Sequence, residues 1–304
     1  MPVREFASGD GPPARRLWDD LGGWYRNTSP SDDADVDRAI GRLLRNPMGS
    51  RRVRRGASAE SAWVALAQGS IIGWLYARTD PDQNYVVPLV PPEDATGAWE
   101  ALLTQARTWF RGLEISRFFV DVPENRADLR AEAQRTGRVL WHRAVLDREV
   151  GLPASTAVPV SARAFRRSDL PHVQELFRTR HPEKTPAPIP VAFLELRAGW
   201  FRDPAWELQR AIWLVGGQKN LLGVAGGTHR PRATLGFLGP WVLSETASPP
   251  VASELLEAVL AWLRGVGAQR VRTTTPTPPG DDAKVLLRNG FVPMAESDLF
   301  EISS

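Results

Sequence analysis

The segment SETASPPVASELLEAVLAWLRG, from Ser244 to Gly265, could bind an anion where a helix begins. The first N–H groups of a helix have no partner within it, and they attract phosphate groups because the helix dipole is positive there. Pro249 and Pro250 lie at this start, and proline has no N–H to donate. The segment therefore predicts an anion site with fewer donors than usual.

Other kinds of chemistry have less support in the sequence. The chain has no cysteine, which excludes a thiolate nucleophile, a disulfide framework and a Cys-type zinc site. No spaced group of His, Asp and Glu suggests a metal site, and no glycine-rich nucleotide loop of the Walker or dinucleotide type is found. We therefore expect no metal.

Length and composition indicate an ordinary globular protein. The 304 residues suggest two domains of about 150 residues each. Hydrophobic residues make up 42% and charged residues 24% of the chain, and no apolar run approaches the roughly 20 residues that cross a bilayer. The first residues, MPVREFASGDGPP, contain no apolar signal segment. We expect a cytoplasmic protein with no membrane partner.

The positive charge of the chain is carried almost entirely by arginine. The formal net charge is +3, and only three of the 38 Lys and Arg residues are lysines. The densest basic cluster is RRVRR, Arg51–Arg55. A solvated loop is its commoner explanation, and a contact for an acidic ligand or a nucleic acid is the alternative. A nucleic-acid partner rests on this arginine excess alone and is the weakest hypothesis.

The chain repeats itself. Residues 99–123 align without a gap on residues 252–276, with seven identities, which include Trp109 on Trp262 and Pro123 on Pro276. Two upstream blocks align in the same order, at offsets of 150 and 159 instead of 153. Such self-similarity indicates a tandem duplication. We predict an N-terminal domain over 1–150, a linker over 151–160 and a C-terminal domain over 161–304.

Each half has the same predicted order of elements. A short strand leads to an amphipathic helix, for which Asp10 and Asp169 are candidate N-caps. A hairpin follows, at residues 61–77 and 211–227, and then a further strand leads into a long helix. Another strand, a short helix ending at Gly137 or Gly290, and a final hairpin close each half. Strands with a central crossover helix predict a mixed α/β sheet.

This order resembles the GNAT acyltransferase superfamily. The segments RAFRRSDLPHVQELFR and DDAKVLLRNGFVP are similar to its first helix and its fourth helix, and ENRADLRAEAQRTGRVLWHRAV is similar to the matching segment of tandem GNAT proteins. The resemblance covers nearly the whole chain. It implies an α/β (α+β) fold of two GNAT-like domains, each a mixed, mostly antiparallel sheet flanked by helices.

The resemblance also implies a place for acetyl-CoA or another acyl-CoA. In the family, backbone N–H groups at the start of the helix after the fourth strand bind the diphosphate. The corresponding residues of the second half, our candidate cofactor-binding residues, are Val242, Leu243, Ser248, Val251, Ala252 and Ser253. In the first half, Glu93 and Asp94 stand where a basic residue would help. We therefore expect the N-terminal domain to be degenerate and the C-terminal domain to be the acyl-CoA site.

GNAT enzymes let an amine attack the thioester, with a base to accept its proton and commonly a tyrosine to protonate the thiolate. The second half has no tyrosine. His229 and Glu245 are the candidate bases of that half, although a solvated hairpin end and a surface carboxylate are the commoner readings of these residues. We expect His142 to be a packed or paired strand histidine, and Asp298 and Glu301 to be exposed on the last strand.

Two further segments could line the acceptor pocket. RHPEKTPAPIP, Arg180–Pro190, falls where the family shapes this pocket, and a stiff surface loop is its alternative reading. Among the 12 tryptophans, those in less regular stretches could line a pocket or a domain interface: Trp24, Trp200, Trp206 and Trp241.

The leading hypothesis is a GNAT-type N-acyltransferase, most simply an N-acetyltransferase, that acts on a small-molecule amine as a monomer or homodimer. The rival is a catalytically inactive pseudo-acetyltransferase that binds a ligand or a partner.

Overall fold

The computed structural model describes residues 1–26, 59–79, 84–151, 161–180, 200–203, 208–217, 220–229, 233–277 and 280–304. The chain divides into two compact units. The first unit comprises Met1–Ala144 together with Met294–Ser304, and the second comprises Val145–Pro293. The basic run Arg51–Arg55 and residues 181–190 lie outside the described residues, so the predictions for those two segments stay predictions.

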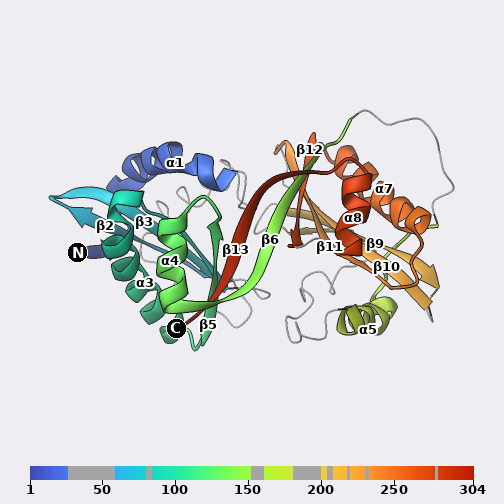
Figure 1. Ribbon diagram of the computed structural model, residues 1–304, viewed down its shortest axis with the longest axis horizontal. Coiled ribbons are helices and arrows are strands. Elements are labelled where there is room, and N and C mark those ends of the chain that lie inside the picture. Colours follow the sequence, from blue (N-terminus) through green and yellow to red (C-terminus); the bar gives the residue numbers. More distant parts are fainter. Residues whose placement is uncertain are drawn as a thin grey trace. The chain divides into compact units, whose positions relative to one another are not determined.

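The first unit is a mixed sheet with helices on both faces (Figure 1). Its elements are β1 (Val3–Glu5), α1 (Gly11–Arg26), β2 (Glu60–Ala67), β3 (Ser70–Thr79), β4 (Asn84–Leu89), α3 (Ala95–Gly112), β5 (Arg117–Pro123), α4 (Ala127–Thr136) and β13 (Val292–Ser303). The strand order is β1-β2-β3-β4-β5-β13, and only β4 and β5 pair in parallel. Helix α1 packs over one apolar core, and α3 and α4 pack over another.

The second unit has the same plan. Its elements are β7 (Arg163–Ala164), α5 (Leu170–Arg180), β8 (Trp200–Asp203), β9 (Leu208–Gly217), β10 (Asn220–His229), β11 (Leu235–Leu243), α7 (Pro249–Gly265), β12 (Arg270–Pro276) and α8 (Asp281–Arg288). The strand order is β12-β11-β10-β9-β7, with β8 also paired to β9, and only β11 and β12 pair in parallel. The predicted fold class is confirmed.

The strands that end the two repeats are exchanged between the units. β13, the end of the second repeat, pairs with β5 of the first unit from Ser297 to Ser303. β6 (Gly137–Glu149) ends the first repeat, and its last residues, from Val145, belong to the second unit, where β6 neighbours β12. The compact units therefore differ from the repeats at 1–150 and 161–304. The final hairpin predicted for each half is wrong, because neither long strand contains the Gly or Asn turn that would fold it back.

Buried ion pairs accompany both exchanged strands. In the second unit, Arg272 donates to both oxygens of Asp147 of β6, at 2.7 and 2.8 Å, and both side chains are buried. In the first unit, the buried carboxylate of Asp298 on β13 accepts from His142 Nδ1 at 2.5 Å and from Arg130 of α4. The expectation that Asp298 is exposed is therefore wrong, because its side chain faces α4 rather than solvent.

Glu301 on the same strand is also largely covered. It pairs with Arg117 at 3.2 Å and with Arg138 at 2.8 Å, and 14% of its side chain is exposed. The expectation of an exposed Glu301 is wrong for the same kind of reason as at Asp298: neighbouring elements supply cations that the local sequence does not reveal.

The duplication is visible in matched contacts. β5 and β12 begin and end at aligned residues, Arg117–Pro123 and Arg270–Pro276. The rings of Trp63 on β2 and Trp109 on α3 lie 6.0 Å apart, and those of their counterparts, Trp213 and Trp262, lie 5.8 Å apart. Two copies of one unit preserve the same strand-to-helix packing.

The first turn of each unit repeats as well. Arg4 donates to both oxygens of Asp10 at 2.6 and 2.8 Å, and Asp10 accepts the Ala7 N–H at 2.7 Å. In the second unit, Arg163 and Asp169 form the same pair at 2.7 and 2.8 Å. Asp10 and Asp169 are both predicted as N-caps. Each carboxylate accepts the backbone N–H of the residue three positions earlier and pairs with an arginine, and these partners lower its pKa.

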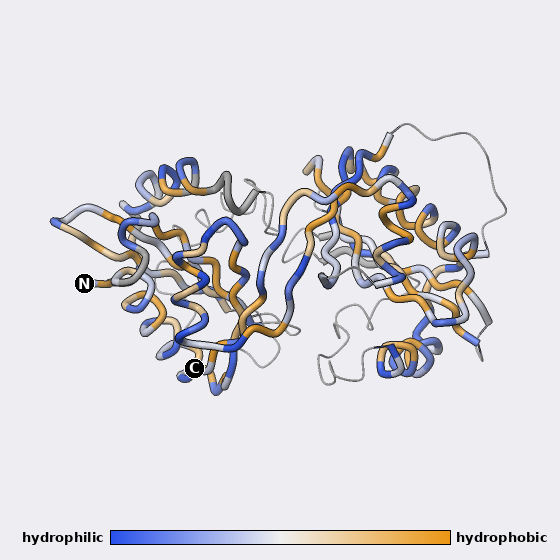
Figure 2. The backbone as a smooth tube through the Cα atoms, in the orientation of Figure 1, coloured by the Kyte–Doolittle hydropathy of each residue, from blue (hydrophilic) through white to orange (hydrophobic). Residues whose placement is uncertain are grey.

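The helices are amphipathic, and their apolar faces pack against the sheets. Figure 2 shows orange and blue segments alternating along α7, as expected for a helix with one buried face. Its buried residues are Ala252, Leu255, Leu256, Val259, Leu260 and Leu263. Within the described part of the chain, every helix is too short or too polar to cross a membrane.

Candidate functional site

In each unit the two parallel strands pair over only part of their length, and we call the unpaired stretch between them the opening. β11 pairs with β12 over Leu235–Phe237 only, although β11 continues to Leu243. β4 pairs with β5 over Tyr85–Val86 only. A strand edge without a neighbour leaves backbone N–H and C=O groups available to other partners. The openings are therefore the places where each unit could bind a ligand along a strand edge.

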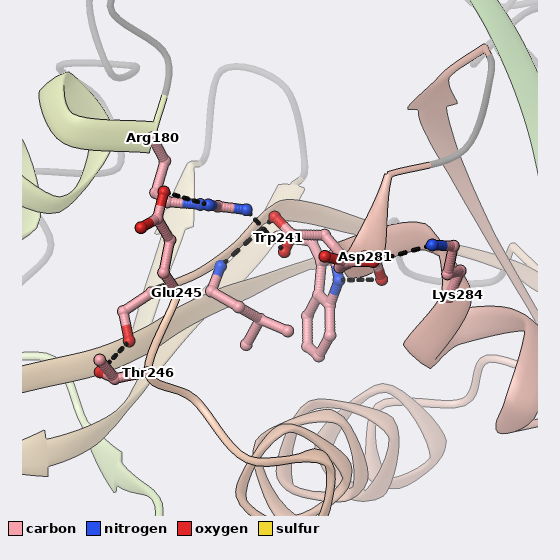
Figure 3. Close-up of polar contacts among 9 residues, drawn as sticks. Arg180, Trp241, Glu245, Thr246, Asp281 and Lys284 are labelled. Carbon is pink, nitrogen blue, oxygen red and sulfur yellow. Dashed lines mark hydrogen bonds and ion pairs between the residues drawn. The ribbon is translucent and has the colours of Figure 1, made fainter.

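In the second unit, the first turn of α8 reaches this open edge (Figure 3). Ser244 N–H donates to the Leu222 carbonyl on the β10 side, so the alternation along the strand turns the Leu243 N–H toward the opening. That N–H donates to Asp282 Oδ2 at 3.5 Å, and the Trp241 indole Nε1 donates to the Asp282 backbone carbonyl at 3.0 Å. Asp282 thus borders the opening through both its side chain and its backbone.

Arg180, the last residue of α5, brings a positive charge to the same place (Figure 3). Its Nη1 donates to Glu245 Oε1 at 3.2 Å, and its Nη2 contacts Asp282 Oδ1 at 3.5 Å. Glu245, one of the two predicted bases, follows the end of β11, and 80% of its side chain is exposed. The structure brings Glu245 to the opening, but as a solvated partner of Arg180.

Asp282 is the titratable group of this site whose environment is most altered. Burial raises the pKa of its carboxyl, and the Arg180 charge and the Leu243 N–H partly oppose that effect. Only 21% of its side chain is exposed. A carboxyl with a raised pKa beside an open strand edge is a candidate general base, because it holds a proton more readily than an exposed aspartate does.

In the first unit, an internal side chain occupies the corresponding position. Val90 aligns with Leu243, and its carbonyl accepts from Arg126 Nη2 at 2.6 Å. Arg126 is completely buried and also donates from Nε to Asp128 Oδ1 at 2.9 Å. Removing these partners from the buried guanidinium of Arg126 would be strongly unfavourable. A buried cation therefore binds the open edge of the first unit through a short hydrogen bond, whereas a partly exposed carboxylate binds that of the second unit through a long contact of 3.5 Å.

The helix start behind the opening offers fewer donors than the sequence suggests. Ser248 is the N-cap of α7, but its side chain makes no capping hydrogen bond, and Pro249 and Pro250 fill the first two helical positions. The Ala252 N–H donates to the Ser248 carbonyl at 3.0 Å, so it is already used within the helix. Helical geometry engages the next N–H, that of Ser253, in the same way. The N–H of Val251, the third residue of α7, has no carbonyl of the helix four residues before it, so helical geometry leaves this predicted donor available.

His229, the other predicted base, lies far from the opening. It pairs with Gly236 at the start of β11, whereas Leu243 at the end of β11 pairs with Gly223. Gly236 and Leu243 are seven residues apart, which is about 24 Å at about 3.4 Å per residue. The structure therefore does not bring His229 and Glu245 together.

The side chain of His229 is buried inside the second unit, where its contacts are those of a structural residue. Its Nε2–H donates to the Ala233 carbonyl at 2.9 Å, and its buried Nδ1 has no hydrogen-bond partner within the described part of the chain. Burial lowers the pKa of the ring, and the bond to Ala233 opposes that effect. A neutral ring is the form that this environment favours.

We expect the stability of the second unit to depend on the charge of His229. The unfolded ring has a pKa of about 6.5 and the folded ring a lower one, so the unfolded state binds a proton first as the pH falls. The stabilisation is fully present above about pH 6.5 and is lost as the pH falls through the folded pKa, by at most about 1.4 kcal/mol per pH unit. Urea unfolding at pH 7 and pH 5 should show a smaller pH effect for His229→Phe than for the wild type. Equal effects would contradict this role.

Sequence reasoning missed two residues of the site. Asp282 is one of two adjacent acidic residues before a helix, a pattern that also suits a solvated first turn. Arg180 opens the proline-rich segment that we associated with an acceptor pocket, but only the fold places it beside β11. Trp241, one of the tryptophans expected to line a pocket, does border the opening. Among the described residues, no group of His, Cys, Asp or Glu is arranged to hold a metal ion.

Comparison with known proteins yields matches among solved structures. No protein-family model matches the chain, and no curated protein matches it by sequence. A tandem GNAT protein from the clavulanic acid biosynthesis pathway has a TM-score of 0.60 at 16% identity, over 99% of this chain and 98% of its own.

Two further structures are similar. A GCN5-related N-acetyltransferase from Sphaerobacter thermophilus has a TM-score of 0.59 at 16% identity, over 99% of this chain and 95% of its own. One from Kribbella flavida has a TM-score of 0.50 at 14% identity, over 75% and 86%. The chain therefore has the tandem GNAT fold.

Proposed function

We propose that this chain, which has the tandem GNAT fold, is an N-acyltransferase that moves an acyl group, most simply acetyl, from acyl-CoA to a small-molecule amine. The second unit is the proposed active unit. The observation that carries this proposal is Asp282, a largely buried carboxyl with a raised pKa at the open edge of β11. The names of the similar structures, a tandem GNAT protein and GCN5-related N-acetyltransferases, support the reaction type. A cytoplasmic monomer or homodimer remains our prediction.

In the proposed reaction, the amine nitrogen attacks the thioester carbon, the amide bond forms and the carbon–sulfur bond breaks. The proton that the amine loses passes to the ionised carboxylate of Asp282, and the leaving thiolate takes a proton from water. General bases of this kind contribute about 10²- to 10⁴-fold to rate. Arg180 favours the ionised form of Asp282, because its charge lowers the pKa of that carboxyl and so opposes the effect of burial.

The residues present fit acyl-CoA in part. The open edge at Trp241–Leu243 offers backbone groups that could pair with the amide groups of the pantetheine arm. The Val251 N–H lies at the positive start of α7, where it could donate to a diphosphate. Two prolines remove the other first-turn donors, so we expect the affinity to be modest.

An inactive binding protein is the second candidate. It is favoured by the prolines at the start of α7 and by the buried Arg126–Asp128 pair that occupies the first opening. Such a protein would keep the fold and the second opening but transfer no acyl group.

Calorimetric titration with acetyl-CoA and with longer acyl-CoAs tests the transferase. Saturable binding at micromolar concentration supports it, and thiol release in the presence of an amine separates it from the inactive candidate. An absence of binding at millimolar acyl-CoA would exclude the transferase.

Replacing the two prolines tests where the diphosphate binds. The double variant Pro249→Gly with Pro250→Gly restores two N–H groups, and a hydrogen bond to a charged group contributes about 1.5–3 kcal/mol. We expect acetyl-CoA to bind at least about tenfold more tightly, as measured by calorimetry. Pro171→Gly, in the first turn of α5, is the matched control and should leave the affinity unchanged. An unchanged affinity in the double variant would mean that the diphosphate does not bind at α7.

A further inference from the structure

The guanidinium of Arg180 has more donors than partners. An arginine carries five N–H groups in a planar fork. Among the described residues, Arg180 contacts Glu245 at 3.2 Å and Asp282 at 3.5 Å, and its buried Nε has no hydrogen-bond partner. A buried donor without a partner is unfavourable, so this guanidinium is suited to accept a further anionic ligand.

The present partner at Nη1 can be displaced at little cost. The side chain of Glu245 is mostly solvent-exposed, and it belongs to the short loop between β11 and α7. An ion pair of this kind contributes little to stability, because water competes for both charges. A carboxylate that arrives from a ligand can therefore replace Glu245 without disturbing the core.

Arg180 and Asp282 together present one positive and one negative charge close to each other. The nearest atoms of the two side chains, Arg180 Nη2 and Asp282 Oδ1, are 3.5 Å apart. In an α-amino acid, one carbon separates the amine from the carboxylate, so its two charges have a matching spacing. An amine without a carboxylate would gain no contact with the Arg180 guanidinium, which would stay paired with Glu245.

We propose that the acceptor of the second unit is an amino-acid-type molecule, whose carboxylate is bound by the fork of Arg180 and whose amine lies beside Asp282. This inference rests on the proposed acyl transfer, since it names the amine that is acylated. The planar guanidinium binds a carboxylate through two parallel N–H···O bonds, which a lysine cannot reproduce. Arg180 is then the residue that selects the acceptor, and Glu245 occupies its place when no acceptor is bound.

The test measures binding of the acceptor without any acyl transfer. The probes are the L-amino acids and their primary amides, titrated by calorimetry into the full-length protein. We expect at least one amino acid to bind at least about tenfold more tightly than its amide. Arg180→Gln should weaken that amino acid by about 10- to 100-fold, which corresponds to the loss of a charged hydrogen bond. The same variant should leave binding of the amide unchanged.

Three further variants make the result specific. Arg178→Gln, on the exposed side of α5 where Arg178 pairs with Glu175, is the matched control and should change nothing. Arg180→Lys keeps the charge without the fork and should give an intermediate loss. Glu245→Gln removes the internal competitor and should tighten binding of the amino acid by a few-fold.

Two outcomes would overturn the inference. One is equal binding of amino acids and amides, or no saturable amino-acid binding at millimolar concentration. The other is a loss of acetyl-CoA affinity in Arg180→Gln, which would assign Arg180 to the diphosphate. Acetyl-CoA binding without amino-acid binding retains the transferase, whereas amino-acid binding without acetyl-CoA binding excludes the transferase alone.

Discussion

Deletion of residues 294–304 is expected to unfold the first unit, although these residues belong to the second repeat. They contain most of β13, which pairs with β5 over seven residues and buries Leu299, Phe300 and Ile302. Burying one such side chain contributes roughly 1.5–3 kcal/mol, so three contribute about 5–9 kcal/mol. The whole stability of a domain is about 5–15 kcal/mol. The strand is therefore indispensable to the unit that it completes.

Hydrogen exchange measured separately for each segment of the chain distinguishes unfolding of the first unit from unfolding of the second. We expect amides of α3 and β5 in the first unit to lose protection in the truncated protein, while amides of α7 in the second unit keep theirs. Full-length Phe300→Ala should give a milder form of the same pattern, with a loss of about 3–5 kcal/mol. Loss of protection in α7 with α3 unaffected would mean that the repeats fold as contiguous halves.

Asp282→Asn is expected to lower kcat by about 10²- to 10⁴-fold, because an amide cannot accept the proton that the amine releases. Thiol release from acetyl-CoA in the presence of an amino acid is the measurement. Asp281→Asn is the matched control, since Asp281 occupies the same turn of α8, is exposed and pairs with Lys284. Equal effects of the two substitutions would remove Asp282 from the mechanism.

The pH dependence of the rate provides an independent check. Asp282 acts in its ionised form, and burial raises its pKa, so activity should fall on acidification above the ordinary aspartate value of about 3.9. Arg180 lowers the pKa of Asp282, and its removal should shift this acidic limb to higher pH. If the acidic limb of the pH–rate profile lies at the same pH in Arg180→Gln as in the wild type, a group other than Asp282 is responsible for it.

The site was only partly predictable because its residues converge from separate elements. Glu245 and Trp241 were identified from the strand and loop that carry them. Asp282 and Arg180 come from α8 and α5, and their local patterns are also those of a solvated helix end. His229 illustrates the opposite error: it follows a strand of the correct half, but antiparallel pairing places it at the other end of β11. Position along the chain does not reveal at which end of a sheet a residue lies.

Local features of the chain are determined by the sequence alone. Hydrophobic periodicity and the gapless repeat predict α3 and α7, the strands that follow them and the mixed sheet, because helix and strand periods depend on neighbouring residues. The aligned copies also match Trp63 with Trp213 and Trp109 with Trp262, whereas the contact between the two rings of each copy is known only from the structure.

Only the tertiary structure decides which strand completes each sheet and which opening stays accessible. β6 and β13 are the aligned ends of two copies of one unit, so the local pattern of either suits the free edge beside β5 or β12. The choice depends on long-range contacts, such as Arg130 with Asp298 and Arg272 with Asp147. Long-range contacts also decide which opening stays accessible. The opening of the first unit holds a buried Arg126 and that of the second a partly exposed Asp282, and this difference distinguishes two otherwise similar units. Burial and charge pairing are properties of packed elements, and no segment carries them by itself.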